Sequence, residues 1–159
     1  MPVGRFDRAE LTEAIRHYEQ VVADCSRSQD WSPFADLFTT DAEYVEHAYG
    51  SFRGREEVRR WICAVMAPFP QMRIEQVWRA YDEENDAVVF GVDNILDHPT
   101  EAGVVFSFPN VSRVVYAGVG LFSSQEDTYT PARDAPRVIG DWVRAGGRLL
   151  CPPAPMKYV

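Results

Sequence analysis

Apolar residues recur at helical spacing in three N-terminal stretches of the chain. The first begins after Asp7 and Glu10, which have the spacing of a capping box, and the second is a short stretch that starts at Ser32-Pro33. The third opens at Gly54 and is stopped by Pro68. The apolar stripes of the first and third stretches predict two amphipathic helices: Leu11, Ile15, Tyr18, Val22 and Cys25, then Val58, Trp61, Ile62, Val65 and Met66.

Strand-like patterns fill most of the remaining chain. The segment "DAEYVEHAYG" alternates and ends at Gly50, which predicts a strand between the second and third helices. From Met72 the period changes to two, in the runs "MRIEQVWRAY", "AVVFGVDNIL", "VVFSFPNVSRVVY" and "GLFSSQEDTY". Pro109 interrupts the third run and indicates a bulge or a sheet edge there. A final helix is predicted over residues 132–145, followed by a proline-rich extended tail.

This order predicts an α+β domain. A curved, mainly antiparallel sheet would wrap on the N-terminal helices to form a conical barrel, with the last helix closing it. The chain has 159 residues and contains no repeat and no linker, so we expect one domain over residues 1–159. A sheet of this kind leaves a conical cavity, which is where ligands generally bind.

Composition excludes several classes of function. The net charge of -8 argues against binding to nucleic acid or to anionic membranes. The chain has no apolar run of the roughly 20 residues that span a bilayer, and its N-terminus lacks the apolar segment of a signal peptide, so a cytoplasmic protein is expected. The three cysteines and three histidines form no ligand pattern, so neither a metal nor a cofactor is predicted.

The segments "FADLFTTDAEYVEHAYGSFRGREEV" and "GLFSSQEDTYTPA" resemble the SnoaL-like proteins of the nuclear transport factor 2-like superfamily. The resemblance covers about residues 11–145. That group includes polyketide cyclases, ketosteroid isomerases and limonene epoxide hydrolases. The resemblance implies the conical α+β fold, but one fold of this kind hosts many unrelated chemistries.

The epoxide hydrolases of the superfamily offer the most detailed comparison. Their Tyr-x-Asn, Arg-x-Asp and final Asp match Tyr44-Val45-Glu46, Gly91-Val92-Asp93 and Asp127 of this chain. The arginine that bridges two carboxylates in the family mechanism is replaced by Gly91, so the resemblance disfavours epoxide hydrolysis. The cyclases and isomerases require one aspartate that moves a proton beside a carbonyl. The resemblance therefore implies Asp127 as the general base and Asp93 as its acidic neighbour.

Strand alternation assigns faces to the acidic residues. Asp127 is expected to point into the cavity and Glu126 out to solvent, because neighbouring strand residues face opposite sides. Tyr44 and Glu46 share one face and are expected to be polar contacts to the ligand. His47 has the opposite parity and would reach the cavity only through a bulge.

Aromatic residues predict the character of the ligand. We expect Trp78, Phe106 and Phe108 to line the cavity, and hence a small apolar ligand such as a polyketide or terpenoid. A homodimer is implied by analogy with the superfamily. The alternative is a noncatalytic ligand-binding or assembly domain on the same fold, and the missing arginine at Gly91 adds weight to it.

Overall fold

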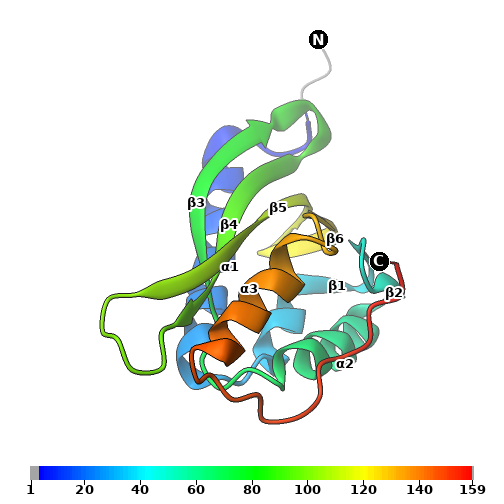
Figure 1. The fold of residues 1–159 in the computed structure, drawn as a ribbon. Helices are drawn as coiled ribbons and strands as arrows, with labels where there is room; N and C mark the ends of the chain where they lie inside the picture. Colours follow the sequence, from blue (N-terminus) through cyan, green and yellow to red (C-terminus); the bar gives the residue numbers. More distant parts are fainter. Residues whose placement is uncertain (1–3, 159) are drawn as a thin grey trace.

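The protein, described over residues 4–158 by a computed structural model, is built on one curved, open sheet. The described residues form three α-helices, α1 (Arg8–Ser28), α2 (Arg55–Met66) and α3 (Asp134–Arg144) (Figure 1). Each of them contributes side chains to the inner side of the sheet. The predicted α+β class is confirmed. No helix within residues 4–158 has the length and apolar content that crossing a bilayer requires.

Helix boundaries follow the local chemistry of the sequence. Asp7 caps α1 by accepting a hydrogen bond from the Glu10 backbone N–H at 2.8 Å, which satisfies one of the free donors of the first turn. The helix ends at Gln29, which takes a left-handed conformation with φ of 58°. The short element predicted at Ser32-Pro33 is a 3-10 helix, η1 (Ser32–Leu37), with proline in its first turn.

The sheet has six strands in the order β2-β1-β6-β5-β4-β3. The last four form the predicted antiparallel meander, with pairings β3–β4, β4–β5 and β5–β6. The strand β1 pairs with β6 in parallel, although the two are far apart in sequence. The strand bounds are β1 (Phe38–Glu46), β2 (Gly50–Arg53), β3 (Arg73–Asp82), β4 (Ala87–Asp97), β5 (Val105–Gly118) and β6 (Leu121–Thr128).

Two features of the sheet refine the expectations from sequence. The strand β2 is too short to show an alternating pattern, and it returns from Gly50 to pair with β1 as a hairpin. Pro109 lies opposite Asp93 of β4, whereas pairing with β6 begins only at Val111. Pro109 therefore occupies a stretch of β5 with a free side, where a missing N–H costs no ladder hydrogen bond.

The hydrophobic core lies between the helices and the inner face of the sheet. The stripe of α1 is buried, with Leu11 and Ile15 fully inaccessible, and it packs against aromatic residues of the sheet such as Phe90 and Phe122. Burying side chains of this size stabilises the fold by about 1.5–3 kcal/mol each. Trp142 anchors α3 by donating its indole N–H to the carbonyl oxygen of Asp97 at 3.0 Å.

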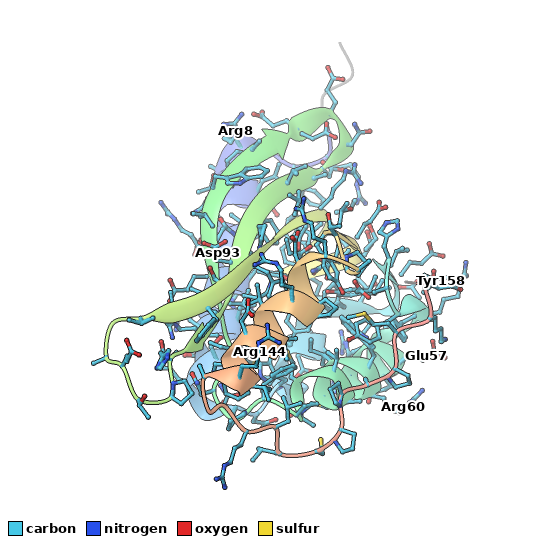
Figure 2. The ribbon with its side chains drawn as sticks, in the orientation of Figure 1. Arg8, Glu57, Arg60, Asp93, Arg144 and Tyr158 are labelled. Carbon is cyan, nitrogen blue, oxygen red and sulfur yellow. The ribbon has the colours of Figure 1, made fainter. Side chains whose placement is uncertain are left out.

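The C-terminal tail crosses the molecule after α3 and ends beside β2 (Figure 1). Its backbone N–H groups at Lys157 and Tyr158 donate to the carbonyl oxygen of Ala48, at 2.7 and 3.1 Å. Tyr158 marks the end of this segment in Figure 2. The tail thereby brings Met156 to the wall of an internal cavity.

Candidate functional site

A cavity of about 350 Å³ lies between the three helices and the inner face of the sheet. Its walls are mainly apolar and aromatic, with contributions from α1, α2, α3 and the five strands β1, β3, β4, β5 and β6. Examples are Val22, Phe34, Ile62, Phe90, Val92 and Phe108. A cavity of this size and character suits a small, largely apolar ligand.

Asp127 points into this cavity from β6. Its residue surface is only 6% exposed, and its parallel neighbour across the sheet is Glu46 of β1. The preceding residue, Glu126, is exposed on the other face, where its Oε1 lies 2.8 Å from Nε2 of His47. The predicted opposite orientation of Glu126 and Asp127 is confirmed.

Three side chains donate hydrogen bonds to the Asp127 carboxylate. Oδ1 accepts from the Ser112 hydroxyl at 2.6 Å and from the Gln125 amide at 2.8 Å, while Oδ2 accepts from the Tyr44 hydroxyl. They come from three neighbouring strands, because β6 lies between β1 and β5. The site is thus assembled by strand pairing.

These donors are themselves held by further hydrogen bonds. Tyr18 of α1 donates to Gln125 at 3.0 Å, and the Gln125 amide also donates to the Tyr44 hydroxyl at 2.9 Å. Asn110 donates to the Ser112 hydroxyl at 3.3 Å. Every chain of donors therefore runs toward Asp127, an arrangement that is complementary to its ionised form.

The pKa of Asp127 is nevertheless raised above its ordinary value, because burial penalises the charged carboxylate more than its hydrogen bonds favour it. Burial and the charge of Asp127 also raise the pKa of both Tyr18 and Tyr44 well above the usual range. The two phenols consequently remain neutral donors beside a carboxylate that titrates closer to neutrality.

Glu46 is the second carboxylate of the cavity. It is only 3% exposed, and its Oε2 accepts backbone N–H groups of Ala48 and Tyr49 at 3.1 and 2.7 Å. Burial raises the pKa of Glu46, while hydrogen bonding from the Tyr129 side chain and from the backbone lowers it, and the charge of Asp127 raises it by a smaller amount. Its Oε1 forms no hydrogen bond within residues 4–158.

Other cavity-lining polar groups also lack a partner in the described part of the chain. They are the side-chain amide of Gln76, the Asn110 Oδ1 atom and the indole N–H groups of Trp31 and Trp61. Buried polar groups without partners are uncommon in folded proteins, and each calls for a specific explanation. Their concentration around one cavity supplies both donors and acceptors to a ligand.

The structure does not bring Asp93 to Asp127, so the predicted pairing of these two acids is wrong. Val92 and Asn94 line the cavity, whereas Asp93, labelled on β4 in Figure 2, has the opposite parity. Gly91, two residues before Asp93 in β4, also faces the outer side of the sheet. The acidic neighbour of Asp127 inside the cavity is instead Glu46, which was expected only as a polar contact.

Two of the three aromatic residues expected in the cavity lie elsewhere. Trp78 is 49% exposed and lies over Gly91 on the outer face, because β3 has an irregularity between Gln76 and Trp78 that shifts its register. Phe106 stacks on His98 with ring centroids 5.6 Å apart and is absent from the cavity wall. Phe108 lines the cavity, as do Tyr44 and Glu46.

Cationic side chains are absent from the cavity wall formed by residues 4–158. Arg79 approaches from β3, but its guanidinium donates to both oxygens of Glu19 at 3.2 Å. Arg113 pairs with Asp82 at 3.5 Å. Neither arginine therefore takes the place of the family arginine that bridges two carboxylates.

Four residues of the polar network escaped the analysis of the sequence as site residues. Asn110 and Ser112 share the parity of Phe108 in β5, and Gln125 shares that of Asp127 in β6, so alternation carried a signal for all three. Tyr18 belongs to the apolar stripe of α1 and looked like core. Only tertiary packing directs its hydroxyl to Gln125.

Comparison with known proteins finds a family match for most of the sequence. A family model described as a SnoaL-like domain matches residues 15–120. No protein of curated function matches the chain.

Solved structures share the fold at low sequence identity. A protein of ketosteroid isomerase-like fold from Catenulispora acidiphila, in complex with trimethylamine, has a TM-score of 0.61 and 20% identity over 76% of this chain and 91% of that one. A protein from Jannaschia described as a SnoaL-like polyketide cyclase has a TM-score of 0.59 and 15% identity, covering 79% and 90%. An epoxide hydrolase from Mycobacterium tuberculosis has a TM-score of 0.62 and 16% identity, covering 84% and 94%.

Proposed function

The chain belongs to the SnoaL-like domain family, and we propose that it catalyses an isomerase- or cyclase-type proton transfer with Asp127 as the general base. The observation that carries this proposal is a buried carboxylate with a raised pKa, facing an apolar cavity and fixed by three hydrogen-bond donors. A base poised toward neutral pH is suited to removing a proton beside a carbonyl group.

The three donors give Asp127 a defined orientation. Oδ1 accepts hydrogen bonds from both Ser112 and Gln125, whereas Oδ2 accepts one hydrogen bond, from Tyr44. Oδ2 therefore keeps a lone pair that can accept a proton from a substrate C–H group. In the proposed reaction Oδ2 takes the proton from the carbon next to a carbonyl, and an enolate forms. The protonated Asp127 then returns the proton to another carbon of the same molecule.

An enolate requires a hydrogen-bond donor at its oxygen. The Tyr44 hydroxyl is engaged with Asp127, but the indole N–H groups of Trp31 and Trp61 and the amide of Gln76 have no protein partner among the described residues. These groups line the same cavity and are neutral, so they stabilise a developing negative charge without neutralising the base.

Epoxide hydrolysis receives less support. That mechanism uses a cation to couple two carboxylates. Glu46 and Asp127 both line the cavity, but the part of its wall formed by residues 4–158 contains no arginine, lysine or histidine. We therefore expect no appreciable turnover of limonene oxide.

Deuterium exchange tests the proposed proton transfer. A small β,γ-unsaturated ketone such as 3-cyclohexenone is incubated with the protein in D2O, and exchange and conversion to the conjugated ketone are followed by NMR. Wild-type protein is expected to accelerate both, and Asp127→Asn to lower the rate by about 10²–10⁴-fold. Binding without exchange would contradict the proposal and indicate a noncatalytic binder, and equal rates in both proteins would contradict the role of Asp127.

A homodimer forms part of the proposal. The outer side of the sheet carries Val77, Trp78 and Val111 as exposed large apolar residues, and such side chains in one area are typical of protein interfaces. Sedimentation equilibrium of the wild type and of Trp78→Glu tests this arrangement. A monomeric wild-type protein would contradict it.

A further inference from the structure

The geometry points to a subsite for a positively charged amine where Glu46 meets an aromatic wall of the cavity. This inference rests on the proposed function, because it names the class of substrate that would lie beside Asp127. It differs from the expectation of a purely apolar ligand.

The carboxylate of Glu46 is only half satisfied. The backbone N–H groups of Ala48 and Tyr49 fix Oε2, whereas Oε1 has no hydrogen-bond partner within residues 4–158. Asp127, by contrast, receives three donors. Of the two carboxylates, Glu46 is therefore the one with fewer fixed donors, and the further group close enough to lower its pKa is the Tyr129 side chain.

The protein supplies no cation to meet this need. Glu19, Glu46, Glu75 and Asp127 all line the cavity, while the part of the wall formed by residues 4–158 includes no basic side chain. Glu19 pairs with Arg79 at 3.2 Å and Glu75 pairs with Arg73 at 2.9 Å, so Glu46 and Asp127 are the members of this set without an arginine partner among the described residues. A cationic ligand would balance the remaining charge, and an anionic ligand would be repelled.

Aromatic rings complete the subsite. Trp61 lies between Tyr44 and Tyr49, with ring centroids 4.8 and 6.3 Å away. Tyr129 approaches Glu46 from the end of β6. Faces of tryptophan and tyrosine rings attract ammonium groups, and such rings beside a carboxylate are a recognition site for amines.

Tyr129 controls access to this subsite. Glu46 Oε1 is buried beneath neighbouring side chains, so a ring must shift before a ligand reaches it. Tyr129 is only partly buried and directly follows the last residue of β6, so its ring is the one expected to shift. A substrate amine would then lie beside Glu46, whose strand neighbours that of the proposed base at a spacing of roughly 4.8 Å.

Two ligands of equal shape test the inference. Benzyltrimethylammonium and its neutral isostere neopentylbenzene are titrated into the full-length protein by calorimetry. We expect the cation to bind at least about 10-fold more tightly, because it meets the buried Glu46 carboxylate as well as the aromatic rings. In Glu46→Gln this preference should fall to about twofold or less, whereas the exposed control Glu126→Gln should keep it. Equal or tighter binding of neopentylbenzene to wild type would overturn the subsite.

A second measurement uses only the wild-type protein, so it tests the inference even if Glu46→Gln fails to fold. Binding of the cation should drive Glu46 to its ionised form, so wild-type titrations near pH 5 in buffers of different ionisation enthalpy should reveal proton release. Absence of release, with the neutral isostere bound as tightly, would overturn the inference.

Asp127→Asn separates the subsite from the proposed catalysis. This variant should lose deuterium exchange and retain the preference for benzyltrimethylammonium. Retained exchange would contradict the catalytic proposal alone, and a lost cation preference would contradict the assignment to Glu46 alone.

Discussion

Glu46 and Asp127 are direct neighbours in the parallel pairing of β1 with β6, and both carboxylates are buried in the wall of one cavity. Burial raises the pKa of both, and the charge of Asp127 adds to the rise at Glu46. Tyr44 and Gln125 are paired in the same register, two residues earlier on each strand. The parallel pairing of β1 with β6 therefore assembles the base, its phenol donor, its amide donor and a second acid.

Replacing Asp127 by asparagine should reduce the dependence of stability on pH. Because the pKa of Asp127 is raised on folding, the native state binds more protons than the unfolded chain between about 3.9 and the native pKa. Stability should therefore fall as the pH rises through this window, and fall less steeply in Asp127→Asn. Urea unfolding from pH 4 to pH 8 measures the difference.

Glu126→Gln is the matched control, because it removes the same charge from the same strand on the exposed face. An NMR titration should find the elevated pKa at Asp127. An Asp127 pKa near 3.9 together with an elevated pKa at Glu126 would contradict the assignment of faces.

Tyr44→Phe should weaken both stability and activity. The change removes the phenol donor from Asp127 and leaves an amide hydrogen of Gln125 without its acceptor, at a cost of about 1–3 kcal/mol. Loss of this hydrogen bond should raise the pKa of Asp127 further and shift the acidic limb of the pH–rate profile upward. Tyr158→Phe, at an exposed tyrosine, should change neither quantity. An unshifted profile in Tyr44→Phe would show that the phenol does not tune Asp127.

Gly91→Arg should not create an epoxide hydrolase. A side chain at this position starts on the outer face, where its Cβ would lie 2.1 Å from the Trp78 Nε1 atom. The half-exposed indole can swing away, so Gly91→Ala should cost about 1 kcal/mol, and this cost should shrink in a Trp78→Ala background. Urea unfolding of the four proteins gives the coupling energy. Turnover of limonene oxide by Gly91→Arg would show that position 91 reaches the cavity.

Deleting the tail after Leu150 should open the cavity without unfolding the domain. The tail contributes Met156 to the cavity wall and is held at Ala48, two residues after Glu46. Greater access of water should lower the pKa of Asp127 toward its ordinary value and weaken binding of apolar ligands. Ligand titration and NMR of the truncated protein check this, with Met156→Ala as an intermediate case. Unchanged affinity in the truncated protein would show that the tail does not close the cavity.

The sequence by itself determined the helices, the antiparallel meander and the opposite faces of Glu126 and Asp127. These features depend on local periodicity and on caps, and in β6 one face is polar enough for alternation to be read. The same alternation also marked Tyr44 and Glu46 as sharing a face, which the structure confirms.

Tertiary structure alone decided which residues meet Asp127. The strand β4 is apolar on both faces, so its pattern could not show that Val92 faces the cavity and Asp93 does not. In β3 the register shift before Trp78 reverses the parity that alternation predicts. The pairing of β1 with β6 joins residues about 80 positions apart, and no local pattern specifies it. Glu46 became the partner of Asp127 because strand pairing sets the distance between such residues, whereas sequence periodicity sets only the face on which each one lies.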